Sequence, residues 1–92
     1  MPVSLSDVLT PSKDVVFREI DREVVILDLE SGSYFGLNAV GSRAWSLLTE
    51  GSALSAVHAA LAGEYDVDAG QLEKDLVAWA DRLVEKGLLR AV

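Results

Sequence analysis

Hydrophobic residues between positions 15 and 37 fall in short blocks that are typical of β-strands. Residues 15–20 and 23–29 are rich in β-branched side chains, and only Asp21-Arg22 separates the two blocks, which favours a tight hairpin. A turn around Gly32 follows, and residues 34–37 then form a third short block. This pattern predicts a three-stranded antiparallel meander.

From residue 38 onward the apolar positions recur at helical spacing. Asn38 is a suitable N-cap for a helix over residues 39–50, which Gly51 ends. Its apolar stripe consists of Val40, Ala44, Leu47 and Leu48, with Trp45 beside it.

Two further helices follow along the chain. Ser52 or Ser55 is expected to cap the second helix, which ends near residues 63–65. The third begins at residues 66–68, where Asp68 and Gln71 have the spacing of a capping pair. It stops at Gly87, and the residues after it fold back onto the core; its apolar positions are Leu72, Leu76, either Trp79 or Ala80, and Leu83.

The order of elements predicts an α+β fold with a three-stranded antiparallel sheet followed by three helices, similar to a winged helix-turn-helix. Residues 1–13 carry both prolines and are expected to form a flexible N-terminal arm with one short turn. Residues 14–92 are then the folded domain, and the length of 92 residues allows only one.

Composition removes several classes of function. The chain has no cysteine and one histidine, which excludes disulfides, thiolate nucleophiles and multi-histidine metal sites; no cofactor and no metal are expected. No apolar run reaches the roughly 18 residues of a membrane span, and no basic segment precedes an apolar one as in a secretion signal. We therefore expect a cytoplasmic protein without a membrane partner.

Candidate catalytic groups do not converge on one site in the sequence. His58 is the only conventional base and lies in the middle of the second helix, where a surface or boundary position is expected. The acidic pairs Asp66/Asp68 and Glu73/Asp75 are better explained by capping and by the dipole at the start of the third helix. We predict that the chain is not an enzyme and assign no catalytic residue.

Charge also argues against a nucleic-acid partner. The chain has 15 acidic and 8 basic residues, for a net charge of −7. The third helix, which would read DNA in a winged-helix protein, holds five acids against three bases over residues 68–86. Such a helix repels phosphates, so fold analogy alone would mislead here.

The third strand comes last in the meander and is therefore expected at an edge of the sheet. An edge strand presents unpaired N–H and C=O groups. A guest peptide pairs with such groups in β-augmentation, but a short, solvated edge is an equally ordinary outcome. These two interpretations stay open on the physics alone.

A family resemblance bears on this choice. The run Tyr34-Phe35-Gly36-Leu37-Asn38 precedes Gly41, Ala44-Trp45, Leu47-Leu48 and Gly51, and further matches follow at Tyr65-Asp66-Val67, Asp75-Leu76, Trp79, Leu83 and Gly87-Leu88-Leu89. This ordered set resembles the PqqD-like family of leader-peptide recognition elements, over about residues 15–89. It is most similar to the stand-alone leader-binding proteins of lasso-peptide biosynthesis.

The resemblance implies a non-catalytic peptide chaperone that binds the leader of a ribosomally made precursor by β-strand addition. Its expected partners are that leader, a leader peptidase and an ATP-dependent cyclase or other modifying enzyme. The alternatives are a chaperone for a peptide modified by a radical enzyme, or an acidic winged-helix adaptor. The implied peptide-binding residues lie on the third strand and third helix: Ser33, Tyr34, Phe35, Gly36, Leu37, Asp75, Leu76, Ala78, Trp79 and Arg82.

Several of these residues have a structural explanation as well. Strand alternation is expected to direct Phe35 and Leu37 to the core and to leave Tyr34 more exposed. The resemblance places the leader in a cleft between the third strand and the third helix. Leu76 is expected on the core stripe, and Trp79 either anchors the core or forms a wall of that cleft. Asp75 and Arg82 are seven residues apart on one helix face, where they either bind polar groups of the leader or only solvate the helix.

Overall fold

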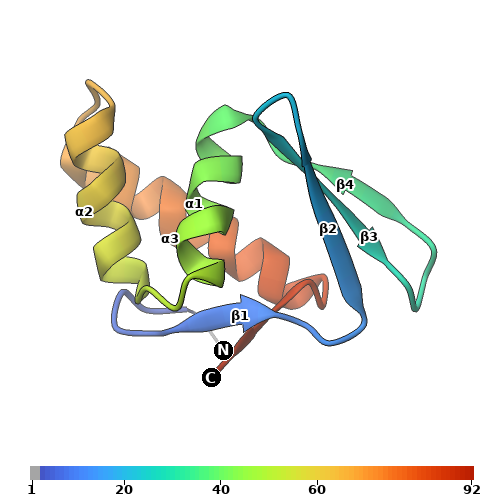
Figure 1. Ribbon diagram of the computed structural model, residues 1–92. Coiled ribbons are helices and arrows are strands. Elements are labelled where there is room, and N and C mark those ends of the chain that lie inside the picture. Colours follow the sequence, from blue (N-terminus) through green and yellow to red (C-terminus); the bar gives the residue numbers. More distant parts are fainter. Residues whose placement is uncertain (1–2) are drawn as a thin grey trace.

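The computed structural model describes residues 3–92 and has the predicted α+β architecture, with an antiparallel sheet followed by three helices (Figure 1). The closer similarity to a winged helix-turn-helix stays a prediction. The elements are β1 (Leu9–Pro11), β2 (Val15–Ile20), β3 (Glu23–Asp28), β4 (Tyr34–Gly36), α1 (Ala39–Thr49), α2 (Leu54–Glu64), α3 (Ala69–Glu85) and β5 (Leu89–Ala91).

The expected meander is present, with strand order β2-β3-β4 and antiparallel pairing throughout. A two-residue turn joins β2 to β3, and both of its residues have positive φ, 51° at Asp21 and 68° at Arg22. This is the conformation that lets a two-residue hairpin follow the twist of the strands. The turn before β4 uses Gly32 at φ 75°, as the sequence indicated.

The N-terminal segment differs from the expectation of a loose arm. Residues 9–11 form β1, which pairs antiparallel with β5 in a second, two-stranded sheet. Leu9 is 1% exposed, and the Val3 amide donates to the Asp81 carboxylate at 3.1 Å. Because β1 and β5 lie at opposite ends of the sequence, nothing in the local pattern indicated that they pair. Residues 1 and 2 lie outside the described residues.

The caps show which helix boundaries local chemistry decides. Asn38 Oδ1 accepts from the Gly41 amide at 2.8 Å, and Asp68 Oδ2 accepts from the Gln71 amide at 2.9 Å, as predicted. The prediction for α2 was wrong, because its N-cap is Ala53 and neither serine caps it through a side chain. The Ser55 amide instead donates to the Leu5 carbonyl at 2.7 Å, so the N-terminal segment takes part in starting this helix.

The core lies between the sheet and the helices. Trp45 is fully buried on α1 and makes an edge-to-face contact with Phe17 of β2, with ring centroids 5.3 Å apart. Leu88 and Leu89 fold back into this core, as expected. Val40 departs from the predicted stripe, since it is 37% exposed and the buried positions of α1 are Ser42, Ala44, Trp45 and Leu48.

A buried serine ties the helices to the meander. Ser42 Oγ on α1 accepts from the Val24 amide of β3 at 2.7 Å and donates to the Leu37 carbonyl, just after β4, at 3.1 Å. α1 therefore lies directly against the end of the sheet, with α2 on its other side in Figure 1 and α3 behind both. No helix within residues 3–92 is long and apolar enough to cross a membrane.

Candidate functional site

The outer edge of β4 carries backbone groups that lack a strand partner. β4 is the last strand in the order β2-β3-β4, so within residues 3–92 only β3 pairs with it (Figure 1). The predicted position of the third strand at a sheet edge is therefore correct. β2 forms the opposite edge of the same sheet.

The register identifies which residues of β4 face outward. The Asp28 amide donates to the Ser33 carbonyl, and the Leu37 amide donates to the Val24 carbonyl, each at 2.9 Å. In an antiparallel ladder these hydrogen-bonded pairs alternate with non-hydrogen-bonded ones. The backbone N–H and C=O groups of Phe35 therefore also point toward β3. Tyr34 and Gly36 occupy the alternate positions, and their N–H and C=O groups point away from the sheet.

A cleft of about 200 Å³ lies beside α3. Four of the five predicted α3 residues line it: Asp75, Leu76, Trp79 and Arg82. Ala78, the fifth, is exposed and is not part of the lining. The sequence did not indicate the rest of the lining, which comes from the start of α1 and from neighbouring helix positions: Asn38, Val40, Gly41, Ala44, Leu61 and Leu72.

Gly41 brings α3 close to the end of β4. A Cβ at this position would lie 3.4 Å from Trp79 Nε1 and 3.6 Å from the Leu37 Cβ. The absence of a side chain at Gly41 therefore lets the indole of Trp79 pack against the start of α1. Trp79 is half-buried against the core and also lines the cleft, so it fills both roles that the sequence left open.

The side chains of β4 divide between two faces. Phe35 and Leu37 are half-buried and pack against the core, whereas Tyr34 is 71% exposed, as expected. Lys86, at the end of α3, places its Nζ 5.5 Å from the centroid of the Phe35 ring. This cation–π contact joins the far end of α3 to the middle of β4.

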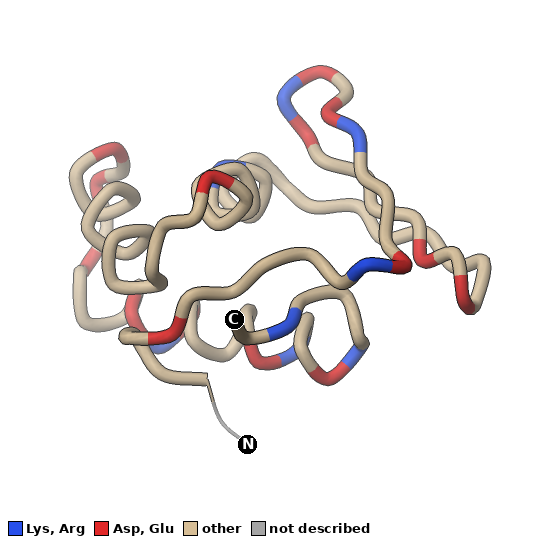
Figure 2. The backbone as a smooth tube through the Cα atoms, turned by 60° about the horizontal axis from the view of Figure 1, so that its bottom comes forward, with Lys and Arg blue, Asp and Glu red and all other residues tan. Residues whose placement is uncertain are grey.

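The charges at the cleft have no ionic partners of their own. Within residues 3–92 the single ion pair is Arg43–Glu64, so Asp75 and Arg82 are both unpaired. Among the residues that the structure describes, the Asp75 carboxylate accepts only from Gln71 Nε2, at 2.9 Å. Figure 2 shows acidic and basic positions interspersed along the chain, without the continuous basic stripe that a nucleic-acid-binding face has.

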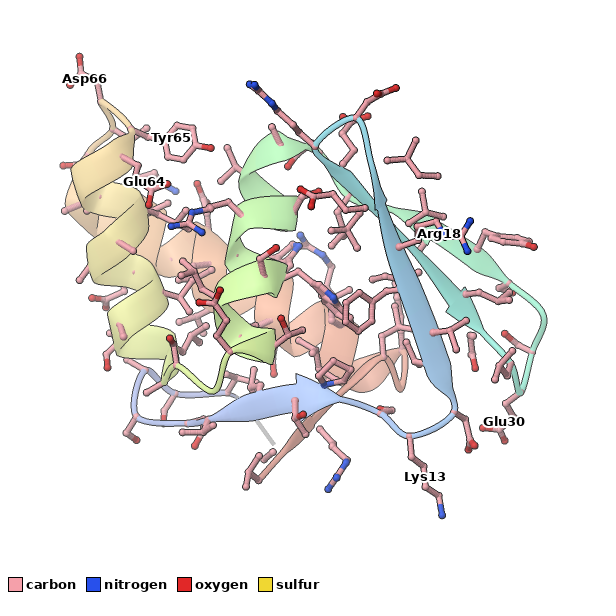
Figure 3. All side chains as sticks on the ribbon, in the orientation of Figure 1. Lys13, Arg18, Glu30, Glu64, Tyr65 and Asp66 are labelled. Atoms are coloured by element: carbon pink, nitrogen blue, oxygen red, sulfur yellow. The ribbon has the colours of Figure 1, made fainter. Side chains whose placement is uncertain are left out.

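Arg43 and Glu64 form an exposed ion pair away from this cleft. Arg43 Nε and Nη2 donate to the Glu64 carboxylate at 3.0 Å, across from α1 to the end of α2, where Figure 3 labels Glu64. The hydrogen bond from Arg43 holds the pKa of Glu64 below its ordinary value and raises the pKa of Arg43. Neither residue lines the cleft, so this pair is part of the scaffold.

A second hollow, of about 390 Å³, lies on the face of the sheet that points away from the helices. Val16 and Ile20 of β2 are about half exposed there, and Tyr34 borders the same hollow from β4. Arg18 is the one charged residue in its lining and is labelled on the sheet in Figure 3. The sequence did not indicate this surface, because β2 reads as an ordinary apolar strand.

His58 and Asp68, two of the candidate catalytic groups, have structural partners. His58 Nε2 lies 2.8 Å from the Ala69 carbonyl, which can only accept, so this nitrogen donates and links α2 to the start of α3. Asp68 caps α3, as predicted. Within residues 3–92 no three His, Cys, Asp or Glu side chains gather as a metal site would require.

Comparison with known proteins identifies the family. The family model described as "Coenzyme PQQ synthesis protein D (PqqD)" matches residues 23–89, which is most of the chain. The chain belongs to the PqqD family. The matched residues include β4 and every residue that lines the cleft. A search of curated proteins gave no match.

Two solved structures resemble this PqqD-family protein closely. "TbiB1 in Complex with the TbiA(beta) Leader Peptide" is 47% identical, with a TM-score of 0.84, and the match covers 88% of this chain and 94% of that one. "Lasso peptide synthetase B1 complexed with the leader peptide" is 26% identical, with a TM-score of 0.83 over 90% of this chain and 98% of that one. Both of those proteins hold a leader peptide.

Proposed function

We propose that this protein binds the leader of a ribosomally made precursor peptide as an added strand on β4 and delivers it to the enzymes of lasso-peptide biosynthesis. The observation that carries the proposal is the unpaired outer edge of β4, whose end at Leu37 lies next to Gly41 in the lining of the α3 cleft. Both solved structures that resemble this chain are complexes with a leader peptide, which supports it. The protein itself takes no catalytic part; its partners, a leader peptidase and an ATP-dependent cyclase, carry out the chemistry.

The backbone of β4 supplies affinity that does not depend on the guest sequence. Tyr34 and Gly36 offer two N–H donors and two C=O acceptors to an antiparallel strand. Each such hydrogen bond contributes roughly 0.5–1.5 kcal/mol net, and ordering a disordered leader opposes this gain. Backbone pairing alone therefore gives weak binding, and contacts in the cleft must add both affinity and selectivity.

The cleft supplies side-chain contacts next to that edge. Trp79 and Leu76 offer apolar surface, while Asp75 and Arg82 offer one charge of each sign. A bound leader keeps the rest of the precursor close to any enzyme that contacts the complex, which raises its effective concentration there. Delivery of a peptide therefore needs no reactive group on this chain.

A second candidate is a chaperone for a peptide modified by a radical enzyme in coenzyme PQQ synthesis, which the description of the matched family favours. The 47% identity to TbiB1 over nearly the whole chain favours the lasso system. A direct comparison of binding to the TbiA(beta) leader and to a PQQ-type precursor distinguishes them. Tighter binding of the PQQ-type precursor would favour the second candidate.

NMR titration with the TbiA(beta) leader peptide tests the proposal. The ¹⁵N-labelled protein should show saturable shifts along residues 33–37 and at Asp75, Trp79 and Arg82. The control is a scrambled peptide of the same composition, which should leave these amides unchanged. Saturable shifts confined to other surfaces, or no binding of the leader, would contradict the proposal.

A further inference from the structure

One face of α3 presents a graded series of charges to the cleft. Asp75, Trp79, Arg82 and Lys86 follow each other at spacings of four, three and four residues, which places them in one stripe along the helix. The first three line the cleft, and the fourth lies over Phe35 of β4. The stripe therefore runs from an acid, past an aromatic ring, to two bases.

Two contacts show that α3 and β4 run in opposite directions. Phe35, in the middle of β4, lies beneath Lys86 at the C-terminal end of α3. Leu37, two residues later, lies beside Gly41, which contacts Trp79 in the middle of α3. As the chain advances along β4, its neighbours on α3 move back toward the helix N-terminus.

This geometry sets the direction of a guest strand relative to the stripe. A peptide that pairs antiparallel with β4 runs parallel to α3, so its N-terminal part lies toward Asp75 and its C-terminal part toward Arg82 and Lys86. The seven residues from Asp75 to Arg82 rise about 10 Å along the helix. That length corresponds to about three residues of an extended strand.

We infer that the stripe Asp75–Trp79–Arg82–Lys86 selects leader peptides by charge polarity, favouring a basic group at the N-terminal end of the paired segment and an acidic group at its C-terminal end. This inference rests on the proposed function. Asp75 and Arg82 are unpaired within the described residues, so a guest with this polarity supplies each with an opposite charge. A guest of opposite polarity, or one that pairs parallel to β4, brings like charges together and is disfavoured.

Other charges of α3 are not part of the stripe. Asp81 accepts from the Val3 amide on the side of the N-terminal segment, and Asp68 caps the helix. The grading is therefore a property of the helix face that carries Asp75, Trp79, Arg82 and Lys86, and the net acidity of α3 does not describe it.

Two peptides of identical composition test the polarity. Each contains the segment of the TbiA(beta) leader that the titration shows to be ordered on β4. The forward peptide adds Lys-Lys before this segment and Glu-Glu after it, and the reversed peptide exchanges the two pairs. We expect the wild-type protein to bind the forward peptide about threefold to tenfold more tightly at low ionic strength, as two exposed ion pairs allow. The preference should shrink in about 0.5 M salt, because exposed charges are screened.

A charge exchange in the protein provides the matched variant. D75K/R82E keeps the net charge at −7, since the first substitution adds two charges and the second removes two. It should prefer the reversed peptide, or at least lose its preference for the forward one because Lys86 remains. The neutral variant D75N/R82Q should keep only the part of the forward preference that Lys86 supplies, which keeps the test available if the exchanged variant folds poorly.

The outcomes separate this inference from the proposed function. Equal binding of both peptides by the wild-type protein, or a forward preference that D75K/R82E retains in full, overturns the charge-polarity inference. The proposed binding of the leader still stands in that case. Failure of the parent leader segment to bind at all overturns the proposed function instead. A nitroxide at the peptide N-terminus should broaden the amide signals near Asp75 more than those near Lys86, and the opposite pattern would show the reverse direction.

Discussion

Trp79 Nε1 lies 3.4 Å from the point where a Cβ on Gly41 would stand. The same Cβ would lie 3.3 Å from Asn38 Oδ1, which caps α1. α1, α3 and the end of β4 therefore meet around a position where an added Cβ makes Asn38 or Trp79 shift slightly. The shape of the cleft depends on this contact, since Asn38, Gly41 and Trp79 all line it.

Gly41→Ala should weaken peptide binding with little effect on stability. Alanine favours the helix by about 0.5–1 kcal/mol, and crowding against Asn38 and Trp79 offsets this gain. We expect peptide affinity to fall about fivefold, equivalent to about 1 kcal/mol, measured by calorimetric titration. The control is Gly63→Ala on α2, where an added Cβ meets nothing within 4 Å. Unchanged affinity in Gly41→Ala would show that Trp79 can move without consequence.

Gly36→Pro should abolish most peptide binding and leave the meander intact. The Gly36 amide points away from β3, so proline removes a donor that only a guest strand uses. We expect a loss of about tenfold or more in affinity, since the ring also obstructs the approaching strand. Gly36→Ala keeps the amide, and its Cβ meets nothing within 4 Å, so it should bind almost normally. Equal affinity of the two variants would exclude strand addition at this edge.

Phe35→Pro, unlike Gly36→Pro, should destabilise the protein itself. The Phe35 amide faces β3, and its loss breaks the β3–β4 ladder within the protein. We expect a clear decrease in the free energy of unfolding, by about 1–3 kcal/mol, measured by urea denaturation. A fully stable Phe35→Pro protein would show that the register assigned to β4 is wrong.

Ser42→Ala should destabilise the fold. The substitution leaves the buried Val24 amide without its acceptor and the Leu37 carbonyl without a donor. An unsatisfied buried group costs about 1–3 kcal/mol, which should appear as a lower midpoint in thermal unfolding. Ser46→Ala on the same helix is the control, because no side-chain hydrogen bond of Ser46 occurs within residues 3–92. A similar midpoint for both variants would contradict the role given to Ser42.

Residues that accept positive φ in the β2–β3 turn should raise the stability of the protein. Asp21 and Arg22 adopt φ values of 51° and 68°, and a left-handed backbone costs arginine more than glycine. The pair D21N/R22G should raise the free energy of unfolding by about 1 kcal/mol, since Asn-Gly is the preferred sequence for this turn. Arg22→Ala removes the charge while keeping the strain, so it should give no such gain. A gain of the same size in Arg22→Ala would attribute the effect to charge.

Stability should depend on Glu64 at neutral pH and lose that dependence in acid. Arg43 lowers the pKa of Glu64, so the stabilisation is present above the pKa of the unfolded chain and disappears as the pH falls through the folded-state pKa. The unfolding midpoint of Glu64→Gln should therefore lie slightly below that of the wild type at pH 7, and the two should converge at low pH. Asp66→Asn makes the same change in net charge and should show a smaller difference. A gap that widens in acid would contradict this sign.

The helices and strands that could be predicted from the sequence are those marked by local signals, such as β-branched blocks and capping side chains. The limits of β2 and β3 follow from a block of β-branched residues, and the starts of α1 and α3 follow from Asn38 and Asp68. These signals act over a few residues and need no distant partner. The N-cap of α2 was missed because Ala53 has no capping side chain, and the N-terminal segment supplies backbone acceptors instead.

The candidate site shows the same division. A third strand at the edge follows from its place as the last strand of the meander, and the resemblance to a known family indicated β4 and α3. The lining residues Gly41 and Val40 were missed, because a glycine and a valine that matches the apolar stripe of a helix carry no sign of a cleft. Lys86 was missed for a similar reason, since its contact with Phe35 exists only when α3 lies across β4.

By itself, the sequence determined the kind and order of the three meander strands and the three helices, because backbone preference, capping and apolar spacing are local properties. It also determined the acidity of the chain and the lack of thiols. Tertiary structure decided that β1 pairs with β5 and that Tyr34 and Gly36 turn their amides outward. It also decided that Asp75 and Arg82 lie along one cleft. These features depend on register and on packing between distant segments, and both are settled only when the whole chain buries its core.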